Sequence, residues 1–185
     1  MKRFILIVST ILLVAGCSLS NEKKTMTPVN GEKSTSATAK FINSDGKDVG
    51  TANLSEDENG VKISLKLHDL TPGEHGIHIH EAGICEKPKF ESAGAHFNPT
   101  QKQHGYYNPK GYHLGDLPNI RVENDGTVDV EFTTKAFSLK TGVANSLFDS
   151  NGSTFIVHAD KDDYKTDPSG NSGGRIACGV IEKNR

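Results

Sequence analysis

The sequence predicts an all-β domain, and three observations support this fold class. Apolar and polar residues alternate without interruption over 61–68 (VKISLKLH) and 128–132 (VDVEF), as they do in strands that bury one face. Short turn-forming segments separate the apolar runs, for example ENG at 58–60 and NDG at 124–126. The 185 residues include 19 Gly and no Trp, and only 6% are aromatic. This composition fits a turn-rich domain better than a helical bundle with a thick aliphatic core.

Three further segments are predicted strands, namely IHIH at 77–80, FIVH at 155–158 and IACGVI at 176–181. No segment shows a sustained helical repeat with caps. The region from about Ala82 to Pro118 lacks strand character. A loop of that length in a compact domain is normally functional, or is held by something other than packing.

The charge balance argues against one class of partner. The chain carries 21 Lys and Arg against 23 Asp and Glu, which gives a net charge of −2. A nucleic-acid-binding protein that relies on bulk positive charge is therefore disfavoured. The eight His and three Cys are the unusual part of the composition.

Residues 1–16 have the organisation of an export signal. Lys2 and Arg3 precede an apolar run that is short and ends abruptly, which suits a signal peptide better than a membrane-spanning helix. The segment VAGC at 14–17 resembles the lipobox of bacterial lipoprotein precursors, which implies cleavage before Cys17 and attachment of lipid to its sulfur. Several acyl chains would anchor the protein stably to the extracytoplasmic face of the cell membrane. The alternative is an ordinary secretory signal in which Cys17 is incidental.

A flexible tether is predicted after the signal. Residues 18 to about 37 contain mostly Ser, Thr, Asn and Lys, and they have almost no large apolar side chains. The expected organisation is therefore a signal peptide at 1–16, a lipidated N-terminus and tether at 17–37, and a folded domain at 38–185.

The spacing of the histidines indicates a metal site. Strand alternation places His78 and His80 on one face, so their imidazoles suit two ligands of one metal. For this pair alone, two exposed or hydrogen-bonded rings would be the simpler interpretation. Further candidate ligands follow along the chain: His96, His104, His113, Asp116 and His158. Three His with one Asp suit Zn²⁺, and several His without a thiolate suit Cu²⁺.

Six motifs occur in a fixed order along the chain. They are GIHIHE at 76–81, HFNP at 96–99, HG at 104–105, HLGDL at 113–117, VHAD at 157–160 and GRIACGV at 174–180. In this order and spacing they resemble the copper-binding strand, the zinc subloop and the C-terminal half of the copper/zinc superoxide dismutases. The resemblance extends from about residue 39 to 182.

The resemblance implies a fold and two cofactors. Taken with the strand pattern, it implies a flattened eight-stranded Greek-key β-barrel, an immunoglobulin-like sandwich with long metal-binding and electrostatic loops. It implies one copper and one zinc per chain. The implied copper ligands are His78, His80, His96 and His158, and the implied zinc ligands are His96, His104, His113 and Asp116. His96 would bridge the metals as an imidazolate, a form that two cations are needed to stabilise.

The activity implied by the resemblance is dismutation of superoxide to dioxygen and hydrogen peroxide. Arg175 would receive the anionic substrate, and His96 would gain and pass on a proton. Without the resemblance, a surface ion pair would be the expected role of Arg175. Asp162 is implied to link His78 to His104, although the adjacent Asp163 could take this place.

The resemblance also implies a disulfide between Cys85 and Cys178. An exported chain meets an oxidising environment, so a bridge is expected there rather than two buried thiols. With lipid on Cys17, all three Cys have a role. Two histidines stay outside the implied site: we expect His68 to face solvent and His75 to bond to the backbone.

Two other functions fit parts of the pattern. A dismutase-like lipoprotein could bind copper or zinc without a catalytic role, and loss of a copper ligand would indicate it. No ligand is missing here. A binuclear metallohydrolase also uses several His and an Asp, but it usually needs a carboxylate two positions after the His-x-His pair, where this chain has Ala82.

Overall fold

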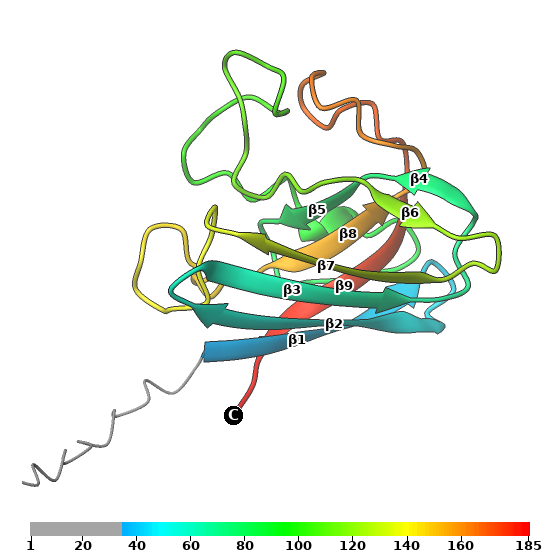
Figure 1. Cartoon of the computed structure of the whole chain (residues 1–185), viewed down its shortest axis with the longest axis horizontal. Helices are drawn as coiled ribbons and strands as arrows, with labels where there is room; N and C mark the ends of the chain where they lie inside the picture. Colours follow the sequence, from blue (N-terminus) through cyan, green and yellow to red (C-terminus); the bar gives the residue numbers. More distant parts are fainter. Residues whose placement is uncertain (1–34) are drawn as a thin grey trace, which may run out of the picture. The chain divides into compact units, whose positions relative to one another are not determined.

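The structure is a computed structural model that describes residues 35–185, and antiparallel strands form its framework (Figure 1). Within this range the strands are β1 Thr35–Asn43, β2 Asp48–Asp57, β3 Gly60–Leu67, β4 Gly73–His75, β5 Ile77–His80, β6 Ile120–Val122, β7 Val128–Thr134, β8 Thr154–His158 and β9 Arg175–Lys183. A short 3₁₀ helix, η1, covers Glu91–Ala93. One sheet has the order β5-β8-β9-β1-β2-β3-β7, and β4 pairs with β6 in a second sheet. The predicted all-β class is confirmed.

The described residues contain nine strands, whereas eight are predicted, because one stretch of chain changes sheets. Gly76 alone separates β4 from β5. Its N–H donates to Asp160 O at 2.9 Å, and its own carbonyl accepts from His158 N at 2.8 Å. The chain therefore leaves the small sheet at Gly76 and enters the large one, where it carries His78 and His80.

The core lies inside the curled seven-stranded sheet. The burial of β3 alternates along the strand, so that Val61, Ile63 and Leu65 are fully buried, as the sequence period predicts. Figure 1 shows β7 and β3 in front of β8 and β9. Residues of both layers belong to one apolar cluster, in which the rings of Phe41 and Phe155 lie 5.7 Å apart. This packed interior is a rigid support for the loops.

The first strand begins three residues earlier than the predicted start of the domain: β1 starts at Thr35, whereas the prediction is near Thr38. Ala37 is fully buried and lies between Leu54 of β2 and Lys183 of β9. Its strand contains only small or polar residues at this end, so hydrophobic alternation gives little signal. The predicted signal peptide at 1–16, Cys17 and most of the tether lie outside the described residues.

Two long segments lie at one end of the large sheet (Figure 1). The first runs from the end of β5 to β6 and, as predicted, has no strand character apart from isolated bridges. The second connects β8 to β9. They are joined to each other by a backbone hydrogen bond from Tyr107 N to Tyr164 O at 2.8 Å, and by side-chain bonds such as Asn119 Nδ2 to Asp162 O at 2.8 Å. Among residues 35–185, no helix is long and apolar enough to span a bilayer.

The predicted disulfide is confirmed. It joins Cys85, in the loop after β5, to Cys178 in β9, across 93 residues of chain. Cys178 also packs with Phe90, Ala93 and Ile156 in a small apolar cluster. The bond and this cluster together hold the loop against the outer side of β8 and β9.

We expect the Cys85→Ala/Cys178→Ala double variant to unfold more easily, because its unfolded chain is no longer cross-linked. The chain-entropy model gives a loss of about 4–5 kcal/mol at most for a loop of this length. Urea unfolding of the metal-free proteins, followed by circular dichroism, measures the difference. Wild-type protein treated with a thiol reductant is the control and should show a similar loss. Equal unfolding midpoints for the oxidised and double-variant proteins would contradict the prediction.

Candidate metal centre

Four histidines converge on one point above the end of the large sheet. His78 and His80 come from β5, His158 ends β8, and His96 lies in the long loop. All four are buried, and one ring nitrogen of each lies within 4.8 Å of the others. Strand alternation produces this arrangement in β5, because Ile77 and Ile79 enter the apolar core while the two histidines point to the other face.

The long loop reaches this point by pairing with the free edge of β5. Phe97 N donates to Ile79 O at 2.8 Å, and Ile79 N donates to Gly115 O at 2.8 Å. His96 and Asp116 are the neighbours of these loop residues, and they bridge to His80 and His78 respectively. The edge of the sheet is thereby covered, and both loop residues are brought beside the strand histidines.

Three of these histidines hold one ring nitrogen in a hydrogen bond. The acceptors are Asp162 Oδ2 for His78 Nε2 at 2.9 Å, Gly94 O for His80 Nδ1 at 3.0 Å and Gly173 O for His158 Nδ1 at 3.2 Å. The remaining nitrogens of these three rings are His78 Nδ1, His80 Nε2 and His158 Nε2, and the fourth histidine adds His96 Nε2. They are buried and have no hydrogen-bond partner among the described residues. Because buried polar atoms are normally paired, four unpaired nitrogens that face one another fit a metal ion.

The surroundings keep these four imidazoles neutral. Burial is the largest cause in each case, and it lowers the pKa of His78 and lowers that of His80 strongly. Burial and the neighbouring rings lower the pKa of His158 to about 3, and burial lowers that of His96 to about 4. At neutral pH each ring therefore keeps a lone pair for a metal.

A second cluster shares His96 with the first. Asp116 Oδ1 lies 2.9 Å from His96 Nδ1, 3.0 Å from His104 Nδ1 and 3.3 Å from His113 Nδ1. The other oxygen of Asp116 accepts the backbone N–H groups of Gly105 and His113, which fixes the carboxylate. Three nitrogens and one carboxylate oxygen are a donor set that Zn²⁺ prefers. His96 presents Nδ1 to this cluster and Nε2 to the other.

Asp162 joins the two clusters, as predicted. Its Oδ2 lies 2.9 Å from His78 Nε2, and its Oδ1 lies 2.9 Å from His104 Nε2. The adjacent Asp163 is exposed and instead caps its own loop through Thr166. Gly170 makes room for the bridge, because a Cβ at this position, where φ is +65°, would collide with Asp162 Oδ1.

The two carboxylates also hold a proton in the second cluster when no metal is present. Burial opposes a charge on His104, but its hydrogen bonds to Asp116 and Asp162 outweigh burial and raise its pKa to about 9. Burial likewise opposes the charge of the carboxylates, yet the hydrogen bonds from the histidines set the pKa of both well below the usual range. A metal ion must therefore displace a proton here.

Arg175 lies beside the first cluster and pairs across the strands with His158. It is half-buried and donates to Phe90 O at 2.6 Å and to Gly94 O at 2.7 Å. A cavity of about 400 Å³ has Arg175 in its wall, together with His80, His96, His158, Pro168 and Ser169. Arg175 and three of the four histidines therefore line the same space.

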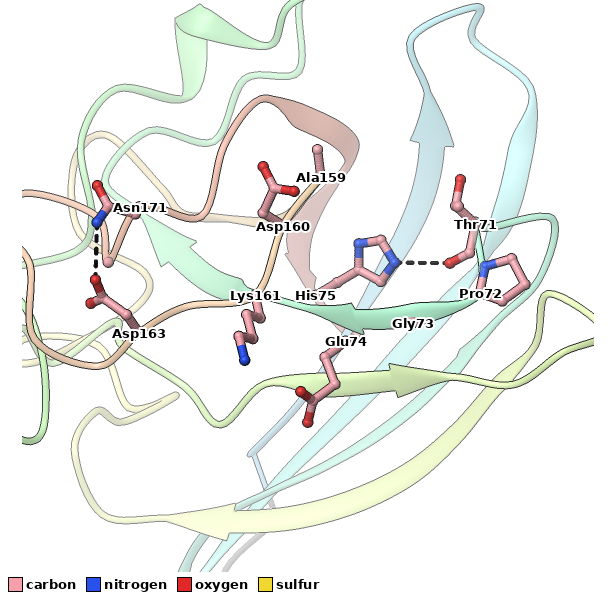
Figure 2. Close-up of a pocket in the computed structure, with 11 residues that line it drawn as sticks. Thr71, Pro72, Gly73, Glu74, His75, Ala159, Asp160, Lys161, Asp163 and Asn171 are labelled. Atoms are coloured by element: carbon pink, nitrogen blue, oxygen red, sulfur yellow. Dashed lines mark hydrogen bonds between the residues drawn. The ribbon is translucent and has the colours of Figure 1, made fainter.

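The two remaining histidines lie outside both clusters, as predicted. His68 is exposed, close to Asp48 and Asp69. His75 is buried, and its ring contacts the carbonyls of His158 at 2.7 Å and Thr71 at 2.8 Å. Figure 2 shows the contact with Thr71 in a second cavity of about 600 Å³, whose charged groups come from Glu74, Asp160, Lys161 and Asp163. None of the candidate ligands lines this cavity.

Sequence reasoning missed several groups that orient the ligands. The carbonyls of Gly94 and Gly173 hold two of the rings, and Tyr106 Oη donates to Asp116 O at 2.6 Å. Asp167 Oδ1 accepts the backbone N–H of His104 at 2.6 Å. Carbonyl contacts have no residue-type signature, and these side chains lie outside the six motifs.

A curled antiparallel sheet with two adjoining clusters that share one histidine defines the class of protein, and comparisons identify the family. A family model described as copper/zinc superoxide dismutase matches residues 49–181. The chain is 45% identical to the superoxide dismutase-like protein YojM of Bacillus subtilis, over 99% of this chain and 97% of that one. It is 42% identical to superoxide dismutase [Cu-Zn] 2 of Aquifex aeolicus, over 98% and 99%. The chain belongs to the copper/zinc superoxide dismutase family.

Solved structures agree with this assignment. A double mutant of a superoxide dismutase-like protein from Bacillus subtilis superposes with a TM-score of 0.76 at 48% identity, covering 77% of this chain and 95% of that one. The Cu/Zn superoxide dismutase of Brucella abortus superposes with a TM-score of 0.64 at 31% identity, covering 80% and 99%. The oxidoreductase class predicted from the motifs is the class of the relatives that are named Cu/Zn superoxide dismutases.

We expect zinc uptake by the metal-free protein to release about one proton at pH 8, because His104 is protonated below its pKa of about 9 and binds metal only when neutral. The apparent zinc affinity should rise with pH up to about 9 and then level off. Calorimetric titration in two buffers of different ionisation enthalpy measures the proton. Asp162→Asn removes one of the carboxylate charges that hold the proton on His104, so this variant should release fewer protons per zinc bound. Zinc binding by the wild type without proton release would show that His104 is neutral.

Proposed function

We propose that the protein dismutates superoxide outside the cytoplasm, with copper held by His78, His80, His96 and His158 and zinc held by His96, His104, His113 and Asp116. One observation carries this proposal: four buried, unpaired ring nitrogens face one another beside Arg175. One copper and one zinc per chain would satisfy both donor sets with His96 in common.

The donor chemistry supports copper in the first cluster. Imidazole is a ligand that suits copper, and this set contains neither a thiolate nor a carboxylate. Copper bound here would supply the one-electron redox chemistry, which takes an electron from one superoxide and gives it to another. Gly94 O, Gly173 O and Asp162 fix the ring orientations, so the four nitrogens are arranged before a metal binds.

Arg175 supplies the binding site for the anion. Its two hydrogen bonds to carbonyl oxygens fix the guanidinium without neutralising it, because the acceptors carry no net charge. Burial is the main cause of a lowered pKa for Arg175, but a guanidinium remains protonated in proteins. Since the chain has a net charge of −2, attraction of superoxide must come from this local field.

His96 and the second cluster position one another. His96 would be held by copper through Nε2 and by zinc through Nδ1, and two cations would stabilise its ring as an imidazolate. Whenever copper did not hold Nε2, that nitrogen would be free to take up a proton and to donate it to a reduced product in the cavity. His104, His113 and Asp116 would hold zinc, which keeps the loop against β5. These residues orient His96 and take no part in electron transfer.

A second function has one specific observation in its favour. A relative that is 45% identical over nearly the whole chain is named only as superoxide dismutase-like. A copper- or zinc-binding protein without a catalytic role would keep the fold and some ligands. The complete copper set and the placement of Arg175 favour the enzyme.

Metal analysis and direct kinetics distinguish these functions. We expect the reconstituted protein to bind about one copper and one zinc per chain and to remove superoxide in pulse-radiolysis measurements. His158→Ala should lose at least about 100-fold in the rate constant, because it removes one copper ligand and opens the site. His68→Gln, which replaces an exposed histidine, is the control and should match the wild type. Full copper occupancy without dismutation would establish the non-catalytic function.

We also propose that lipid on Cys17 anchors the mature protein to the extracytoplasmic face of the membrane. The support is the sequence at 14–17, after a basic and apolar leader. Such a tether would leave the barrel free of the bilayer while keeping the enzyme at the cell surface.

We expect Cys17→Ser to move the protein from the membrane fraction to the soluble or secreted fraction and to abolish incorporation of a labelled palmitate analogue. The thioether to lipid requires the cysteine sulfur, so serine cannot replace it. Ser18→Ala, next to the same cleavage point, is the control and should remain membrane-bound. Membrane retention and labelling of the Cys17→Ser variant would show that the anchor lies elsewhere.

A further inference from the structure

We propose that Asp167 is a positioning residue for the two histidines found only in the second cluster, because it holds the backbone of His104 and faces the ring of His113. It also connects these histidines to the wall of the copper-side cavity. The inference rests on the proposed zinc site. It adds a second carboxylate, besides Asp162, through which the loop between β8 and β9 acts on the metal centre.

One oxygen of Asp167 accepts a hydrogen bond from His104 and faces His113. Asp167 Oδ1 accepts the backbone N–H of His104 at 2.6 Å, and it lies 4.0 Å from His113 Nε2. The second distance is too long for a hydrogen bond but close enough for attraction between a carboxylate and an imidazole N–H. His113 directs Nδ1 at Asp116, so Nε2 is the nitrogen that remains to face Asp167.

Asp162 and Asp167 therefore have complementary contacts. Asp162 holds the rings of His78 and His104, whereas Asp167 holds the backbone of His104 and faces the ring of His113. His104 is fixed at both its ring and its main chain by one loop. Histidines that bind metals commonly direct the second nitrogen at a carboxylate, and losing such partners typically costs 10–100-fold in affinity.

Asp167 is also continuous with the cavity wall. Pro168 and Ser169, which follow it directly, line the cavity of about 400 Å³ with Arg175 and the copper-side histidines. A displacement of Asp167 must therefore move that wall. Through this connection, zinc held by His104 and His113 would set the position of a surface that superoxide passes.

The loop has other attachments that do not involve Asp167. Tyr107 N donates to Tyr164 O at 2.8 Å, and Asn119 Nδ2 donates to Asp162 O at 2.8 Å. Asp167 itself is 47% exposed at its side chain, so its replacement leaves no cavity in a core. Variants at this position are therefore expected to fold.

The test compares copper- and zinc-loaded wild type with Asp167→Ala, Asp167→Asn and the control Asp160→Ala. Asp160 lies in the same loop and carries the same charge, but its side chain makes no hydrogen bond or ion pair among residues 35–185 (Figure 2). We expect Asp167→Ala to bind zinc about 10–100-fold more weakly in chelator competition and to retain copper. Asp167→Asn keeps an oxygen for His104 N–H without the charge, and should fall between Asp167→Ala and wild type.

Two further measurements separate positioning from a general effect on folding. Cobalt placed in the zinc site should show an altered visible spectrum in Asp167→Ala and an unaltered one in Asp160→Ala. Amide exchange of residues 169–171 should increase on zinc removal in the wild type, and should already be raised in zinc-loaded Asp167→Ala. Wild-type zinc affinity and cobalt spectrum in Asp167→Ala would overturn this role alone. Absence of zinc binding by the wild type would overturn the zinc assignment and this role together.

Discussion

The bridge made by Asp162 is the interaction on which the rest of the centre depends. One carboxylate receives an imidazole from β5 and an imidazole from the long loop, each at 2.9 Å. It thereby fixes which nitrogen each ring turns toward its cluster: Nδ1 of His78 on one side and Nδ1 of His104 on the other. Gly170 permits this approach, and the Asn119 side chain holds the backbone N–H and carbonyl of Asp162 in place. The β-sheet supplies the rigid base on which such a short bridge can be kept.

In the absence of metal, the same arrangement lowers the free energy of unfolding. Four buried nitrogens without partners lose their hydrogen bonds to water and gain none in exchange. The second cluster does not carry this cost, because both ring nitrogens of His104 are paired with buried carboxylates, which raise the pKa of His104 and have their own pKa lowered by the histidines. The apolar core and the disulfide supply the stability that holds the ligands together under this penalty. Preorganisation of this kind favours tight metal binding, because little reordering remains to be done.

Much of this architecture can be predicted from sequence because its signals are local. Alternation at 61–67 identifies β3, and the His-x-His pair in β5 follows from the same period. β1 is the counterexample: Thr35 and Ser36 are strand residues only because they pair with β2, and Ala37 because it pairs with β2 and β9. The ligand residues are recognisable by type and order, whereas the main-chain acceptors are not. Gly94 O orients a ligand without any side chain, so only the folded chain reveals it.

The carbonyl of Gly94 has a consequence for how the protein can vary. It accepts His80 Nδ1 at 3.0 Å and an Arg175 N–H at 2.7 Å, so one oxygen atom sets the position of a ligand and of the anion-binding cation. The segment that carries this atom begins at the disulfide and includes η1. Any substitution that shifts the segment displaces both groups in the same direction. Selection cannot therefore adjust the anion-binding group in this region independently of the metal ligand, and the segment has to change as a unit.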